Sequence, residues 1–97
     1  MRAVGYFKNG PLSEPGALQD VNVPEPAGGP FDIIVDVKAV SVNPVDYKVR
    51  MRSAPQGQGP KVIGFDAAGV VRSVGKEAAG LFRPGDEVYY AGAINRQ

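Results

Sequence analysis

Glycine and proline recur along the whole chain and limit the length of any helix or strand that it can form. The 97 residues include 13 glycines and 9 prolines, above the usual shares of about 7% and 5%. Proline removes a backbone donor and glycine weakens regular structure, so these residues divide the chain into short segments. The pattern predicts one mainly β domain with short strands and many turns.

The composition excludes several classes of function. Cys and His are both absent, so disulfides are impossible, and most zinc and haem sites, a Cys nucleophile and a serine triad would lack their usual atoms. Lys and Arg total 11 against 10 for Asp and Glu, which predicts no nucleic-acid and no membrane partner. Without a signal-peptide core or a membrane-length apolar run, we expect a cytoplasmic protein.

Hydrophobic alternation and turn signals place the secondary structure. We expect strands over residues 2–7, 18–23, 31–40, 67–74 and 87–91, a loop over 53–60 and a turn or short helical stretch over 76–81. The strand over 31–40 should place four apolar side chains on one face, namely Ile33, Val35, Val37 and Ala39. Asn43 is a preferred N-cap residue and Pro44 fits the first helical position, so a short helix should start there.

Three motifs in this order resemble the medium-chain dehydrogenase/reductase family. They are Lys-Ala-Val-Ser-Val-Asn-Pro-Val-Asp over 38–46, Gly-Phe-Asp-Ala-Ala-Gly-Val-Val over 64–71 and Phe-Arg-Pro-Gly-Asp-Glu-Val over 82–88. The closest likeness is to the zinc-independent quinone oxidoreductase branch, whose members are often labelled zinc-binding alcohol dehydrogenases. The resemblance implies an N-terminal GroES-like domain over 1–97, a partly open β-barrel with one or two short helices. A Rossmann domain would follow Gln97, so we expect this chain to be a fragment.

The resemblance also implies that this chain binds no zinc. Zinc-using relatives have a cysteine ligand at the position of Asn43 and a histidine ligand at that of Phe65. Asn43 offers a weak neutral oxygen and Phe65 offers no donor, so the donors that bind zinc tightly are missing. The implied reaction is therefore direct hydride transfer from NADPH to a small quinone or α,β-unsaturated carbonyl, without a metal.

Three residues are candidates for catalysis. The resemblance implies that Asn43 lines the nicotinamide and substrate cleft, although it could serve only as the helix cap. Tyr47 and Lys48 are the groups best able to donate a hydrogen bond to a developing enolate or hydroquinone oxygen. Several quinone reductases have a tyrosine where this chain has Lys48, so the choice between the two stays open. Both could also be simple solvated helix residues.

Four further residues are expected around the cleft. Asp46 could transfer a proton, but its place in the first helical turn favours a helix-stabilising role. Arg50 could reach the cofactor or form an ion pair with a carboxylate such as Asp66. Phe65 and Asp66 are expected as a cleft wall, although an aromatic side chain in a small domain is more often core packing.

Three alternatives remain. No Gly-x-Gly-x-x-Gly fingerprint occurs, so the isolated chain should neither bind NADPH tightly nor turn over substrate. It could be a non-catalytic interaction module that forms a homodimer through exposed strand edges, or, less favoured, a co-chaperonin-like ring subunit. A fragment of a zinc-dependent alcohol dehydrogenase is disfavoured by the missing Cys and His. The acceptor and the choice between NADPH and NADH stay open.

Overall fold

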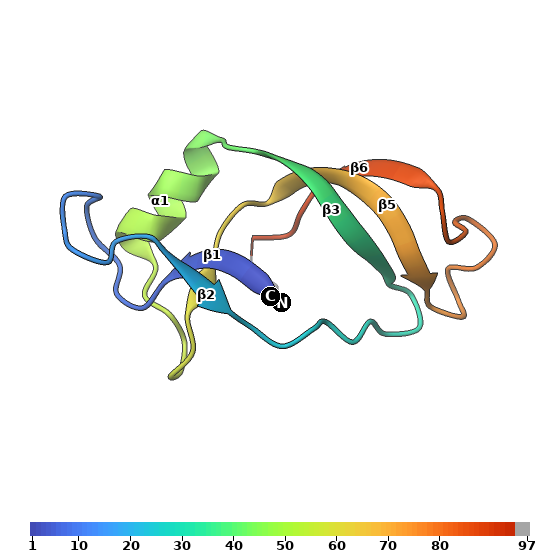
Figure 1. Ribbon diagram of the computed structural model, residues 1–97, viewed down its shortest axis with the longest axis horizontal. Coiled ribbons are helices and arrows are strands. Elements are labelled where there is room, and N and C mark those ends of the chain that lie inside the picture. The colour runs from blue at the N-terminus through green and yellow to red at the C-terminus, as the bar shows by residue number, and fades with distance from the viewer. Residues whose placement is uncertain (95–97) are drawn as a thin grey trace. The chain divides into compact units, whose positions relative to one another are not determined.

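The structure is a computed structural model that describes residues 1–94, and it is mainly β with one helix (Figure 1). The elements are β1 (Arg2–Tyr6), β2 (Gln19–Asn22), β3 (Ile33–Ser41), α1 (Pro44–Arg52), β4 (Lys61–Val62), β5 (Asp66–Val74) and β6 (Glu87–Ala91). The mainly β prediction is confirmed, and the helix starts at Pro44 as expected. Among the described residues the strands form two open three-stranded sheets rather than a closed barrel.

The chain divides into two compact units, which are described separately. The first comprises residues 1–24, 42–65 and, within the described part, 93–94, and the second comprises 25–41 and 66–92. In the first unit β1 lies between β2 and β4 and pairs antiparallel with both. The two-residue strand β4 was not predicted. It approaches β1 at Gly5, where a Cβ would lie 2.6 Å from the carbonyl oxygen of Lys61.

Tyr6, the last residue of β1, is fully buried and contacts the C-terminal end of α1. Its hydroxyl lies 3.0 Å from the carbonyl oxygen of Val49, which also accepts from the Ser53 N–H, and 2.6 Å from the carbonyl oxygen of Ser53. Burial raises the pKa of the Tyr6 phenol, and the nearby charge of Arg50 opposes part of that rise. No helix within residues 1–94 is long and apolar enough to cross a membrane.

In the second unit β5 is the central strand and pairs antiparallel with β3 on one side and β6 on the other (Figure 1). Gly69 of β5 packs directly on β3, where a Cβ would overlap the carbonyl oxygen of Asp36. Gly75, just after β5, packs closely on the carbonyl oxygens of Gly29 and Pro30. Any side chain at Gly69 would therefore separate the two strands.

The prediction that Ala39 shares a face with Val35 and Val37 is wrong, because β3 contains an irregularity. Val37 pairs with Gly69 but Ala39 pairs with Ala68, which leaves Lys38 as an extra residue. Such a bulge moves every following side chain to the opposite face of the sheet. The face of Val35 and Val37 is therefore continued by Val40, the partner of Ala67.

An exposed ionic cluster joins three parts of the second unit. Arg72 of β5 donates hydrogen bonds to the carboxylate of Asp36 on β3. Its Nη1 also lies 3.3 Å from Oε2 of Glu25, in the segment between β2 and β3. The hydrogen bond from Arg72 holds the pKa of Asp36 below its usual value.

Candidate functional site

The start of α1 is built by Asn43, Pro44 and Asp46. Asn43 is the N-cap residue with extended backbone angles, φ −130° and ψ 164°, and Pro44 occupies the first helical turn. Asp46, at the third helical position, accepts a hydrogen bond on Oδ2 from the backbone N–H of Asn43 at 2.8 Å, and its own N–H donates to the Asn43 carbonyl at 2.9 Å. The prediction that Asn43 caps this helix is confirmed.

Asp46 also connects the helix to the second family motif. Its Oδ1 accepts a hydrogen bond from the backbone N–H of Gly64 at 2.7 Å, across 18 positions of sequence. Gly64 has φ 94°, a left-handed conformation that favours glycine. The Asp46 side chain is only 4% exposed, and these contacts support the helix-stabilising role that the sequence favoured. Its alternative role in the substrate cleft stays a prediction.

The other candidates on α1 differ in exposure. Tyr47 is 51% exposed and Lys48 is also exposed, so both can meet a molecule from solvent. Arg50 is half-buried, and its Nε is enclosed without a hydrogen-bond partner among residues 1–94. The backbone carbonyl of Arg50 accepts from the N–H of Gly10 at 3.0 Å, which holds the N-terminal loop against the helix. The proposed pairing of Arg50 with Asp66 stays a prediction.

Phe65 follows Gly64 directly and is 7% exposed. An aromatic ring buried to this degree contributes mainly to packing, which agrees with the more conservative of the two roles considered from the sequence. A role as cleft wall stays a prediction.

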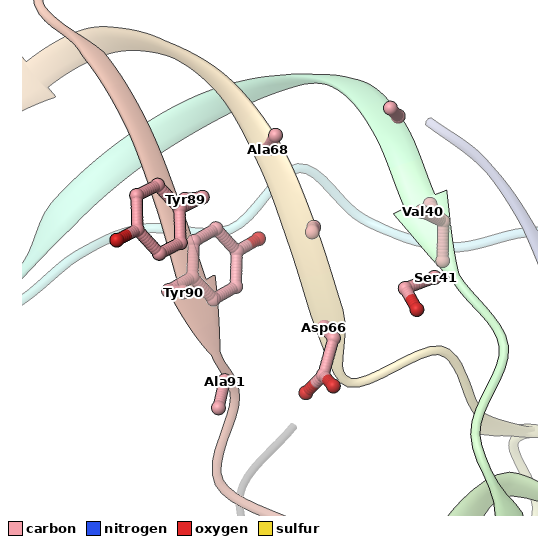
Figure 2. Close-up of a pocket in the computed structure, with 9 residues that line it drawn as sticks. Val40, Ser41, Asp66, Ala68, Tyr89, Tyr90 and Ala91 are labelled. Atoms are coloured by element: carbon pink, nitrogen blue, oxygen red, sulfur yellow. The ribbon is translucent and has the colours of Figure 1, made fainter.

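The second unit carries a separate open hollow of about 560 Å³ on the β3-β5-β6 sheet (Figure 2). Asp66 lies at the start of β5, opposite Ser41 of β3 and Ala91 of β6 in the strand register. Figure 2 shows Tyr89 and Tyr90 of β6 among the side chains that line the hollow, and Tyr89 is 90% exposed. The hollow is lined by Ala39, Val40, Ser41, Asp66, Ala67, Ala68, Tyr89, Tyr90 and Ala91.

Of the hollow's lining residues, only Asp66 is a candidate site residue from the sequence. Ala67 and Ala68 of the central strand β5 have small side chains that fill little space beside Tyr90 and Tyr89, their partners on β6. This accounts for the hollow at that point. Two sequence features could have indicated the hollow. One is the aromatic pair Tyr89-Tyr90 near the end of a short strand, and the other is the pair of small residues Ala67-Ala68 in the second motif. That pairing depends on strand register and is not visible from spacing alone.

The described residues do not offer a zinc site. Among residues 1–94 no group of three or more His, Cys, Asp or Glu side chains is placed to hold a metal ion. Zinc prefers thiolate and imidazole ligands, and Asn43 and Phe65 supply neither. The residues present therefore do not fit a catalytic zinc.

Comparison with known proteins agrees with this fold and these motifs. The alcohol dehydrogenase GroES-like domain family matches residues 29–96. This chain therefore belongs to that family, within the medium-chain dehydrogenase/reductases.

Three similar proteins illustrate the relationship. A Rhizobium etli CFN 42 structure, provisionally described as a zinc-dependent alcohol dehydrogenase, is 56% identical with a TM-score of 0.92, over 99% of this chain and 28% of that one. Escherichia coli quinone oxidoreductase complexed with NADPH is 29% identical with a TM-score of 0.78, over 96% and 27%. A zinc-type alcohol dehydrogenase-like protein of Staphylococcus aureus (strain COL) is 41% identical over 100% of this chain and 28% of its own length.

The relatives also include fungal trans-enoyl reductases. The chain spans only about a quarter, 23–28%, of the length of the curated relatives that it matches. The names of these relatives, quinone oxidoreductase and trans-enoyl reductase, describe oxidoreductases that are longer than this chain.

Proposed function

We propose that this chain is the N-terminal domain of an NADPH-dependent, zinc-independent reductase that transfers hydride to a quinone or an α,β-unsaturated carbonyl compound. The observation that carries the proposal is the pair Asn43 and Phe65, which occupy the two zinc-ligand positions of metal-using relatives in a chain with no Cys or His. The quinone oxidoreductases and trans-enoyl reductases among the relatives support this class of acceptor.

The proposed chemistry needs a hydrogen-bond donor rather than a metal. NADPH, when bound, supplies a hydride. Addition of that hydride to a conjugated acceptor forms a C–H bond and moves an electron pair onto the acceptor oxygen, which must then be stabilised and protonated. Tyr47 and Lys48 are exposed donors on α1 and are the groups proposed for this task. Asn43 is proposed to orient the acceptor and the nicotinamide.

Most of the cofactor would be held outside these residues. Asn43 and Arg50 are the positions of this chain proposed to contact it. The guanidinium of Arg50 is half-buried and its Nε is enclosed, so a contact with the cofactor would have to come from the other guanidinium nitrogens. We therefore expect the 97-residue chain alone to bind NADPH weakly, and a cytoplasmic location stays a prediction.

A chimeric enzyme tests the proposal. This chain would replace the corresponding N-terminal 28% of the Rhizobium etli relative, and NADPH oxidation would be followed with a panel of quinones, enones, aldehydes and ketones. We expect turnover with quinones or enones in the presence of a chelator. Tyr47→Phe or Lys48→Met should lower kcat, whereas Lys76→Met, at an exposed turn of the other unit, should not. Zinc-dependent oxidation of simple alcohols with no quinone or enone reduction would contradict the proposal.

A further inference from the structure

The Asp46 carboxylate is buried, and each of its oxygens is engaged by a backbone N–H from a different segment. Oδ2 accepts from Asn43 at 2.8 Å and Oδ1 accepts from Gly64 at 2.7 Å. With only 4% of its surface exposed, the group cannot readily exchange these partners for water. Hydrogen bonds to a charged acceptor are about twice as strong as neutral ones, and the N-terminal end of the helix dipole also favours a negative charge there.

These two bonds join the segments that carry the zinc-ligand positions of metal-using relatives. Asn43 occupies one position, and Gly64 directly precedes Phe65, which occupies the other. Asp46 links the two segments within the first unit.

We propose that Asp46 is a positioning residue that fixes Asn43 relative to the Gly64–Phe65 segment. The consequence for catalysis rests on the proposed reductase function, but the link itself does not. Because both carboxylate oxygens are bound and the side chain is buried, Asp46 does not meet the acceptor. Proton donation is then left to the exposed groups Tyr47 and Lys48.

The backbone shape of the second segment leaves the Gly64 N–H available to a side chain. Gly64 has φ 94° and lies between β4 and β5, so its N–H belongs to no regular strand. Gly64 itself is exposed, and the hydrogen bond is part-buried because its acceptor, Asp46, is buried. The carboxylate of Asp46 satisfies that donor and holds the turn at the same time.

Nuclear magnetic resonance of the ¹⁵N-labelled 97-residue chain tests the link without requiring turnover. The variants are Asp46→Ala, which removes both acceptors, and Asp46→Asn, which keeps one acceptor oxygen. Asp20→Asn, on the exposed strand β2 of the same unit, is the matched control. The measured quantities are the amide proton shifts and hydrogen-exchange rates of Asn43 and Gly64, compared with those of the paired strand residues Ala3 and Val21.

We expect Asp46→Ala to move both amide protons upfield and to speed their exchange roughly ten- to a hundredfold, the loss expected for a bond to a charged group. Ala3 and Val21 should change far less. Asp46→Asn should release one of the two amides and Asp20→Asn neither. If Asp46→Ala does not fold, Asp46→Asn decides the question alone. Unchanged Asn43 and Gly64 amides, or an equal change throughout the first unit, would overturn the proposal.

The two experiments distinguish a wrong positioning role for Asp46 from a wrong reductase function. The amide measurement reports only on the contacts of Asp46, whereas the chimera reports only on hydride transfer. An intact link in a chimera that reduces no quinone or enone would refute the function and leave the positioning role standing.

Discussion

Two aspartates of this chain are stabilised by different partners, and the difference decides what each can do. Asp46 is buried and bound by backbone N–H groups, so its role is to hold two segments together. Asp36 is exposed enough to meet solvent and is bound by the guanidinium of Arg72. Exposed pairs of this kind contribute little to stability, but they respond to pH in a predictable direction.

Replacing Arg72 by alanine should raise the pKa of Asp36 toward its ordinary value near 3.9, because the hydrogen bond from Arg72 is the main cause of the lowered pKa. Since the folded pKa lies below the unfolded one, the contribution of the pair is complete above about pH 4 and is lost as the pH falls through the lowered pKa. A ¹³C carboxyl titration measures the shift. Arg52→Ala, at the exposed end of α1, is the control. An Asp36 pKa that is unchanged in Arg72→Ala would show that Arg72 is not the cause of the lowered pKa.

At the scale of elements, α1 is held at both ends by side chains from elsewhere in the chain or from its own first turn. Asp46 binds the N-terminal end to Gly64, and Tyr6 of β1 meets the carbonyls at the C-terminal end. Helices of this length are marginal on their own. The position and direction of the helix therefore depend on these contacts, and so do the directions of Tyr47 and Lys48.

The close packing of β5 on β3 gives a prediction for Gly69. Alanine at this position should destabilise the chain by about 1–3 kcal/mol, because its Cβ would overlap the Asp36 carbonyl and the strands would have to separate. Gly80→Ala is the matched control, since nothing lies within 4 Å of a Cβ at that glycine, and it should change stability by less than about 0.5 kcal/mol. Urea unfolding of both variants measures the difference. Equal losses at the two positions would show that the close contact is not limiting.

Local signals predicted much of the fold. The bounds of β6 and the start of α1 follow from a turn motif and from the Asn43-Pro44 pair, both of which act over a few neighbouring residues. The strand β4 was missed because two residues carry no periodicity. The reversed face of Ala39 was missed because the bulge at Lys38 arises from pairing with β5, a long-range property.

The site was less predictable than the fold. Asn43 as N-cap could be inferred from its neighbour Pro44. The bond from Gly64 to Asp46 and the contact of Tyr6 with Ser53 join residues 18 and 47 positions apart, and nothing in the spacing indicates such distances. The hollow beside Tyr89 depends in the same way on the register of three strands.

For the whole molecule, this chain matches roughly a quarter of the length of the relatives with which it aligns. The residues proposed to stabilise the acceptor lie in this chain, whereas the main cofactor platform would not. Homodimer formation and a purely non-catalytic role remain predictions that the sequence raised. Our central proposal is that the reductase to which this chain would contribute works without a catalytic metal.

Zinc analysis tests that claim most directly. The 97-residue chain and the chimera would be dialysed against a weak chelator, analysed for metal by mass spectrometry, and the chimera then assayed for quinone or enone reduction. We predict far less than one zinc per chain and undiminished turnover, because positions 43 and 65 hold asparagine and phenylalanine. One retained zinc per chain, or activity that is lost on chelation and restored by zinc, would contradict the account.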